Sequence, residues 1–211
     1  MIKLLIIDNY DSFTYNLVHL FGALPDVNVK VVRNDDDFIL ELEKGGIDGV
    51  IISPGPGTPL DKEYFGKNDE VINRFGKQGL PILGICLGFQ GIAVAFGAEL
   101  KEAPLPQHGK ASALKIIKNG RILAGVPDGI KVMRYHSLML DAAKTIPAEL
   151  DILAESKPGS PSIELNGREV MAVEHKEYPI YGLQFHPESY ATELGNIIAG
   201  NFVNIIKELQ A

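Results

Sequence analysis

The chain has 211 residues, of which 45% are hydrophobic and 22% are charged. This composition is typical of a soluble globular protein with a substantial core, and the length suits one domain, 1–211, better than two. A formal net charge of −7 argues against a nucleic-acid or anionic-membrane surface, and the single cysteine fits a reducing, cytoplasmic compartment. No apolar run approaches the roughly 20 residues of a membrane span, and the N-terminus lacks the layout of a signal peptide.

The first half of the chain alternates short apolar runs with amphipathic segments. The runs have the length and apolar content of buried strands, and the amphipathic segments repeat apolar residues at helical spacing. The expected strands are Ile2–Ile7, Val27–Arg33, Gly49–Ser53 and Leu80–Ile85. The expected helices are Phe13–Leu24, Phe38–Glu43, Glu70–Phe75 and Leu87–Phe96. This alternation predicts an α/β fold, an open and mostly parallel twisted sheet with helices on both faces.

The second half changes to short β-rich runs, followed by a closing helix over Glu193–Leu209. Asn119-Gly120 and Asn166-Gly167 are strong hairpin signals between such runs. We therefore expect antiparallel additions to the same domain. The expected strands are Ser112–Lys118, Lys131–Tyr135, Leu150–Glu155, Ser162–Leu165, Val170–His175 and Ile180–Phe185.

Cys86 lies where a buried strand runs directly into a helix. It is flanked by Gly84 and Gly88, and this Gly-x-Cys-x-Gly pattern is the cysteine counterpart of the nucleophile elbow. Such a tight turn crowds the residues on either side, and it places the sulfur at a helix N-terminus, where the thiolate is favoured. The amide of Leu87 would point to the same place and could donate to an oxyanion. The alternative is that Cys86 is a small buried hydrophobic residue.

A thiolate nucleophile needs a base and a group that orients the base, and His186 and Glu188 suit these roles. His186 directly follows the expected strand Ile180–Phe185, at the sheet edge where catalytic groups are usually presented. Residues two apart in extended backbone project to the same side, so Glu188 can reach His186. A surface His beside a surface Glu is the plainer alternative, and His136 competes for the role of base. No His and Cys spacing fits a zinc site, so we expect no metal.

Four distinctive segments are spread over nearly the whole chain: Asp8-Asn-Tyr-Asp-Ser-Phe-Thr-Tyr-Asn16, Ser53-Pro-Gly-Pro-Gly-Thr58, Gly84-Ile-Cys-Leu-Gly-Phe-Gln90 and Gln184-Phe-His-Pro-Glu-Ser189. Together they resemble the class I, triad-type glutamine amidotransferases. Within this family, the chain is similar to the small subunits of anthranilate synthase and aminodeoxychorismate synthase in two places, the segment Asp8–Asn16 and the segment Tyr135–Leu138. Residues 60–69 and 106–109 depart from the common pattern of these subunits.

The resemblance implies that Cys86 attacks the side-chain amide of L-glutamine, with His186 as base and then acid and Glu188 as the group that orients it. It also implies oxyanion donors and a set of residues that bind the glutamine. The implied oxyanion donors are the amides of Leu87, Gly55 and Gly57, and the implied substrate-binding residues are Gly55, Pro56, Gly57, Gln90, Ser137 and Leu138.

The same resemblance implies a larger partner subunit, which receives the ammonia through a channel and aminates chorismate. No cofactor is expected in this subunit, and Mg²⁺ is expected on the partner. Anthranilate synthase is the preferred assignment, with aminodeoxychorismate synthase, or one subunit shared by both, as the alternative.

Two hypotheses from other classes remain. A flavodoxin-like binding module would hold a phosphate on Asp11-Ser-Phe-Thr14, although this loop lacks the glycines that let backbone amides surround a phosphate. A cysteine peptidase or thiol sensor would use the same elbow around Cys86 on a different substrate.

Overall fold

The computed structural model describes residues 1–144, 146–159 and 161–211. Its strands fall mostly where the apolar runs lie. Four of them are buried along nearly their whole length, as strands covered on both faces are: Ile2–Asp8, Gly49–Ile52, Ile82–Ile85 and Ile180–Leu183. The strands are β1 (Ile2–Asp8), β2 (Val27–Arg33), β3 (Gly49–Ile52), β4 (Ile82–Ile85), β5 (Leu100–Glu102), β6 (Lys110–Ile116), β7 (Lys131–Arg134), β8 (Leu138–Leu140), β9 (Leu150–Ser156), β10 (Val170–His175) and β11 (Ile180–Leu183).

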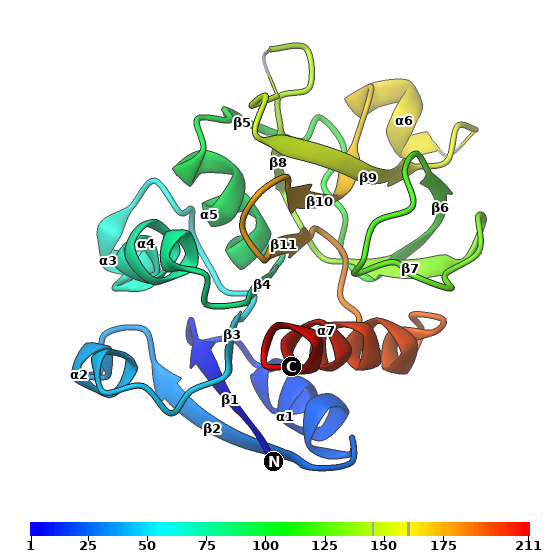
Figure 1. Ribbon diagram of the computed structural model, residues 1–211. Coiled ribbons are helices and arrows are strands. Elements are labelled where there is room, and N and C mark those ends of the chain that lie inside the picture. The colour runs from blue at the N-terminus through cyan, green and yellow to red at the C-terminus, as the bar shows by residue number, and fades with distance from the viewer. Residues whose placement is uncertain (145, 160) are drawn as a thin grey trace.

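Within the described residues, nine of these strands form one sheet in the order β2-β1-β3-β4-β11-β10-β9-β6-β7, and β5 and β8 form a separate antiparallel pair (Figure 1). The pairs from β2 to β11 are parallel. The pairs from β11 to β7 are antiparallel. The predicted α/β sheet with antiparallel additions is thus confirmed, and the two kinds of pairing meet at β11.

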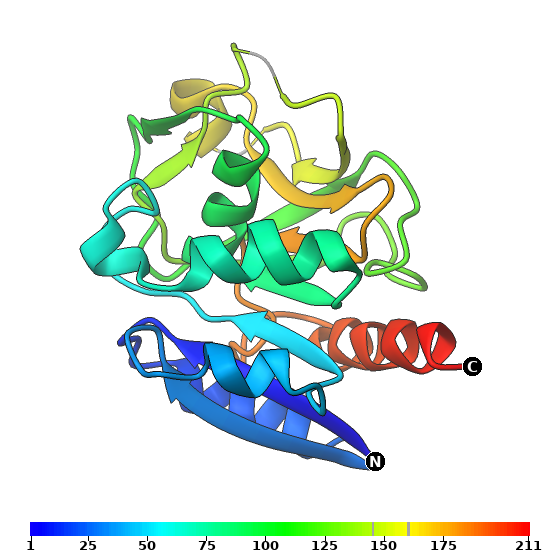
Figure 2. The same ribbon diagram turned by 60° about the vertical axis from the view of Figure 1, so that its left-hand side comes forward.

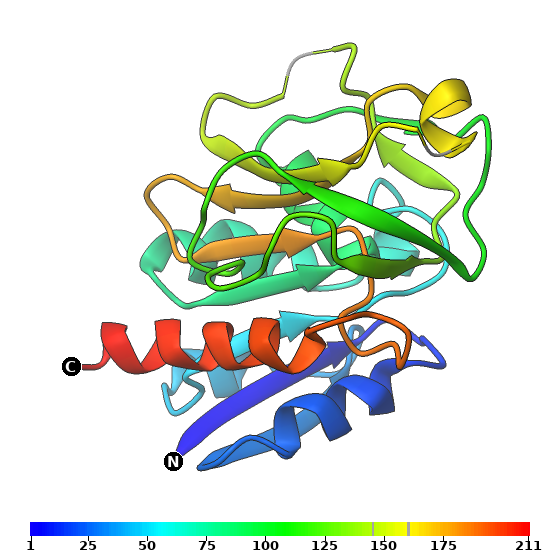
Figure 3. The same ribbon diagram turned by 90° about the vertical axis from the view of Figure 1, so that its right-hand side faces the viewer.

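Helices cover both faces of the parallel half. The first and last helices lie side by side on one face, where Phe21 and Phe202 meet edge to face at 6.3 Å, and the helix that follows β4 lies behind the sheet (Figure 3). The other face carries the helix that follows β2 and the helices that follow β3 (Figure 2). The helices are α1 (Thr14–Gly22), α2 (Ile39–Glu43), α3 (Lys62–Phe65), α4 (Asn68–Glu70), the π-helical turn η1 (Val71–Phe75), the 3₁₀ turn η2 (Gly76–Gln78), α5 (Leu87–Ala95), α6 (Pro161–Asn166) and α7 (Gly195–Leu209).

The segment Ser162–Leu165 is not a strand, as the sequence predicted, but part of the helix α6. Gly167, at a φ of 74°, ends this helix, and its amide donates to Ile163 O at 2.9 Å. Asn166-Gly167 is therefore a helix terminus, since glycine takes the left-handed conformation that a helix end needs at no steric cost. Asn119-Gly120 is not a hairpin turn either, because β6 ends at Ile116 and the next strand begins at Lys131.

No helix among the described residues is both long and apolar enough to cross a membrane.

Candidate active site

Cys86 lies between β4 and α5, at the carboxyl edge of the parallel strands. Its backbone has φ 52° and ψ −97°, a conformation that costs a non-glycine residue about 1–3 kcal/mol. Two hydrogen bonds hold it there: the Cys86 amide donates to Leu183 O at 2.8 Å, and Gln90 N donates to Cys86 O at 3.0 Å. The strand and the helix therefore fix the strained turn from both sides.

The two glycines of the elbow are required by close backbone contacts. A Cβ atom on Gly84 would lie 2.4 Å from the carbonyl carbon of Gly88. A Cβ atom on Gly88 would lie 2.5 Å from the carbonyl oxygen of Ile52 on the neighbouring strand β3. These contacts confirm the crowding that the sequence predicted on both sides of Cys86.

The structure brings His186 and Glu188 to the same place. Nδ1 of His186 donates to Oε1 of Glu188 at 2.6 Å, and both side chains are buried. The other ring nitrogen, Nε2, makes no protein hydrogen bond of normal geometry. The plainer alternative, a surface His beside a surface Glu, is therefore wrong.

Electrostatics couple His186 to Cys86. Burial alone would lower the pKa of His186, but the neighbouring Cys86 side chain and the Glu188 carboxylate outweigh it and raise that pKa to about 10. At neutral pH the imidazole is thus protonated, and it faces a sulfur and a carboxylate that both favour the cation.

A cavity of about 170 Å³ opens at Cys86. This volume is smaller than the roughly 300–1,000 Å³ of pockets for drug-sized ligands, and it suits a single small molecule better than a peptide. All of the predicted substrate-binding residues line it. The lining is Gly55, Pro56, Gly57, Cys86, Leu87, Gln90, Tyr135, His136, Ser137 and Leu138.

Three backbone amides beside this cavity are available to a ligand. Within the described residues, the amides of Gly55 and Gly57 donate to no protein acceptor. Leu87 is the first residue of α5, where a helix has no partner for the amide. The three predicted oxyanion donors are therefore brought to one site, next to the helix N-terminus.

Gln184 is a site residue that the sequence reasoning missed. Its Nε2 atom lies 3.6 Å from the sulfur of Cys86, and its Oε1 atom accepts from Gln90 Nε2 at 3.2 Å. Gln90 Nε2 also donates to Leu138 O at 3.0 Å, so the side chain of Gln90 links Gln184 to the backbone of Leu138 across the cavity wall. The signal was present, because Gln184 begins the segment that carries His186.

Aromatic rings pack against the imidazole of His186. Tyr135 meets it edge to face, with ring centroids 4.9 Å apart, and Phe13 does so at 6.2 Å. These rings exclude water from one side of the ring and leave it few other orientations.

His136 does not compete as a base. It is buried in the wall of the cavity, and neither of its ring nitrogens has a hydrogen-bond partner among the residues that the structure describes. Burial, with a further contribution from the Arg134 guanidinium, lowers its pKa to about 3. Of the other histidines, His108 is exposed and His175 is buried.

The loop proposed to hold a phosphate is already occupied by its own side chains. Thr14 donates its hydroxyl to Asp8 Oδ1 at 2.8 Å, and the Phe13 amide donates to Asp11 Oδ1 at 2.8 Å. Two carboxylates in the loop would repel a phosphate, so this geometry does not support a flavodoxin-like site.

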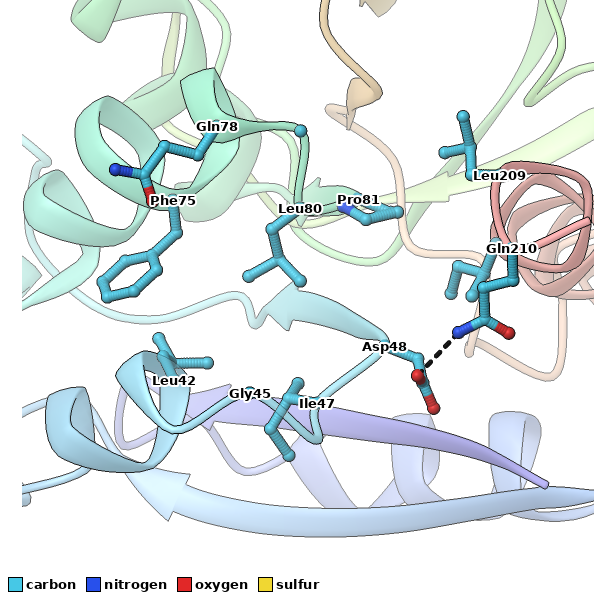
Figure 4. A pocket seen from close by; sticks show the side chains of 12 residues that line it. Leu42, Gly45, Ile47, Asp48, Phe75, Gln78, Leu80, Pro81, Leu209 and Gln210 are labelled. Carbon is cyan, nitrogen blue, oxygen red and sulfur yellow. Dashed lines mark hydrogen bonds between the residues drawn. The ribbon is translucent and has the colours of Figure 1, made fainter.

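A larger hollow of about 380 Å³ lies at the opposite edge of the sheet, where β3 and β4 begin (Figure 4). Its walls combine apolar and polar surface, and its carboxylate, Asp48, accepts from Gln210 Nε2 at 2.6 Å. Leu42 and Phe75 line the other side of the hollow. Among the described residues that line this hollow, none is a cysteine, serine or histidine. Among the described residues, no group of three or more His, Cys, Asp or Glu side chains is placed to hold a metal ion.

Comparisons with known proteins agree with this geometry. The family model of glutamine amidotransferase class-I matches residues 5–206. An anthranilate synthase component 2 of Saccharolobus solfataricus is 44% identical over 95% of this chain and 97% of the relative. An aminodeoxychorismate synthase of Streptomyces griseus is 40% identical over 95% of this chain and 25% of that longer protein. A solved structure described as a GMP synthase subunit of Thermoplasma acidophilum has a TM-score of 0.82 and 30% identity, and the match covers 100% of this chain and 96% of that one.

The family model spans nearly the whole chain, and the relatives reach 40% identity or more over the same length. The chain belongs to the class-I glutamine amidotransferases.

Proposed function

We propose that this protein is the glutaminase component of an anthranilate synthase, which hydrolyses L-glutamine and supplies ammonia to a larger subunit that aminates chorismate. The observation that carries the chemistry is the strained Cys86 turn, beside the buried His186–Glu188 pair and three free backbone amides. The assignment to anthranilate synthase is supported by a relative of that name at 44% identity over almost its full length.

The reaction begins with Cys86 as thiolate and His186 as imidazolium. The sulfur attacks the side-chain amide carbon of glutamine, and the carbonyl oxygen becomes an oxyanion that accepts hydrogen bonds from the amides of Leu87, Gly55 and Gly57. His186 then gives its proton to the amide nitrogen, the C–N bond breaks, and ammonia leaves. The product on the enzyme is a γ-glutamyl thioester on Cys86.

Hydrolysis of the thioester uses the same groups in reverse. Neutral His186 takes a proton from a water molecule, which attacks the thioester carbon, and glutamate leaves as the Cys86 thiolate re-forms. Glu188 holds the imidazole through Nδ1, so that Nε2 faces the reacting atoms in both steps. Gln90 and the backbone of Ser137 and Leu138 bind the amino-acid end of glutamine, since they line the cavity beyond Cys86.

The proposal extends to the surroundings of the enzyme. The glutaminase acts in a cytoplasmic complex, ammonia passes through a protein channel, and Mg²⁺ belongs to the chorismate site of the partner rather than to this subunit. Aminodeoxychorismate synthase is the second candidate, because a protein of that name is 40% identical over 95% of this chain.

The test uses the complex reconstituted with the synthase subunit of the same organism. We expect Cys86→Ser to abolish synthesis driven by glutamine and to leave synthesis driven by ammonium within about twofold, because the ammonium route bypasses the thioester. Glutamine-driven synthesis that survives in Cys86→Ser would overturn the mechanism. The product identifies the pathway: anthranilate supports the first assignment, and aminodeoxychorismate supports the second.

A further inference from the structure

Three buried asparagine side chains meet beneath the loop that carries the oxyanion donors, here residues 54–57. Asn9 follows β1, Asn34 follows β2, and Asn68 begins α4. All three are at most 2% exposed, and none of them lines the glutamine cavity. The chemistry proposed above gives them no role, although buried amides are costly to keep unless they are hydrogen-bonded.

Asn9 binds the residue that leads into this loop. Its backbone amide donates to Ser53 Oγ at 2.9 Å, and its side-chain Nδ2 donates to Ser53 O at 2.8 Å. Ser53 in turn donates its hydroxyl to Pro54 O at 2.6 Å. The first peptide of the loop is thus held through Ser53 by both the backbone and the side chain of Asn9.

The other two asparagines fix the orientation of the Asn9 amide. Its Oδ1 atom accepts from Asn34 Nδ2 at 2.9 Å and from Asn68 Nδ2 at 2.6 Å. With its oxygen occupied by two donors, the amide can only direct Nδ2 toward Ser53.

Asn9 also touches the loop directly. A Cβ atom on Gly55 would lie 2.5 Å from Asn9 Cβ and 2.7 Å from Asn9 O. The loop therefore rests on Asn9 at the residue whose amide is free for the oxyanion. A shift of Asn9 would therefore displace the loop at Gly55, and oxyanion stabilisation depends on donors placed before the reaction begins.

We propose that Asn9 is a positioning residue that sets the backbone amides of Gly55 and Gly57 for the oxyanion. The inference rests on the proposed glutaminase function and deepens it, because it names the group that holds the oxyanion site in place. Asn9 itself touches neither glutamine nor Cys86 in this role.

The test separates oxyanion stabilisation from the reactivity of Cys86. Glutamine hydrolysis passes through an oxyanion, whereas alkylation by iodoacetamide is a displacement in which the thiolate attacks a CH₂ carbon, iodide leaves and no oxyanion forms. In the complex with the synthase subunit, we expect Asn9→Ala to lower the kcat for glutamine about 10- to 100-fold, since loss of one oxyanion donor costs about 100- to 1,000-fold. We expect the KM for glutamine within about threefold and the alkylation rate within about twofold of wild type.

Asn166→Ala is the matched control. Asn166 is also a buried asparagine, with two hydrogen bonds to Leu105 and one to Glu169, but it does not contact residues 54–57. We expect it to keep the kcat for glutamine within about twofold. Asn9→Asp provides a second variant if Asn9→Ala does not fold, since it keeps the side-chain size and the two accepted bonds and loses the Nδ2 donor. It should show the same loss of kcat at pH 8.

The outcomes are distinct. An unchanged kcat in Asn9→Ala or Asn9→Asp, or an alkylation rate that falls in parallel with kcat, would overturn the role of Asn9. A wild-type complex that does not hydrolyse glutamine would instead overturn the proposed function.

Discussion

Replacing Gly84 by alanine tests whether the elbow needs its glycines for steric reasons. The new Cβ would lie 2.4 Å from the carbonyl carbon of Gly88 and 2.5 Å from its oxygen, where ordinary contact begins at 3.4 Å. Both neighbours are backbone atoms, so no side chain can rotate away. The start of α5 must therefore move from β4 by about 1 Å, the difference between 3.4 and 2.4 Å.

Two consequences of this shift can be measured. Overpacking of this kind costs about 1–3 kcal/mol of unfolding free energy, or more where backbone must move. A displacement of about 1 Å at a reacting group costs about 100-fold in rate, and the elbow carries both Cys86 and the amide of Leu87. We therefore expect Gly84→Ala to lower the urea midpoint by about 1 M, for an m-value of about 2 kcal/mol per M, and to lower kcat for glutamine about 100-fold.

Gly200→Ala is the matched control, because Gly200 lies within α7 and a Cβ there would meet nothing within 4 Å. Alanine costs about 0.5–1 kcal/mol less than glycine in a helix interior, so this variant should be slightly more stable than wild type and equally active. Wild-type stability and turnover in Gly84→Ala would refute the steric argument for the elbow.

Three further predictions concern buried titratable side chains. Glu188→Gln removes a carboxylate that helps to raise the pKa of His186 to about 10, so the pKa of His186 should fall in this variant. Because His186 supplies the proton to the leaving ammonia, the alkaline limb of the kcat–pH profile should move to lower pH. An alkaline limb that does not move would contradict this role of Glu188. His136 is a neutral imidazole in the folded protein, with its pKa near 3, and it gains a proton on unfolding below pH 6.5. Its contribution to the unfolding free energy should therefore fall by about 2 kcal/mol from pH 6.5 to pH 5. Urea denaturation of His136→Gln at several pH values should lack this part of the pH dependence. Glu169→Ala leaves the buried Arg134 guanidinium without its carboxylate and should cost about 3–5 kcal/mol by urea denaturation, so a loss below 1 kcal/mol would contradict the role of this ion pair.

The nucleophile and its partners could be predicted because their determinants are local in sequence. Cys86 stands two residues from each of its glycines, and His186 stands two residues from Glu188, so strand and turn geometry decide their contacts. The segment Ser162–Leu165 shows the opposite case. Four residues are too few to separate strand alternation from one helical turn, and the glycine that ends α6 served equally well as a hairpin signal.

The support of the oxyanion loop depends on strand register, which the sequence did not provide. The prediction of parallel strands was enough to bring the loops after β1, β2 and β3 to one edge of the sheet. Contact among their side chains needs more: Asp8 pairs with Arg33, and Ile7 pairs with Ile52. This register sets Asn9 level with Asn34 and Ser53 one residue behind. A one-residue slip of β2 or β3 would point their side chains to the opposite face and separate these groups, although every strand would keep its predicted place. The apolar packing that fixes the register of the parallel strands therefore also fixes Asn9 beneath the loop that carries the Gly55 and Gly57 amides. In this way the core of the sheet determines the geometry of the proposed oxyanion site.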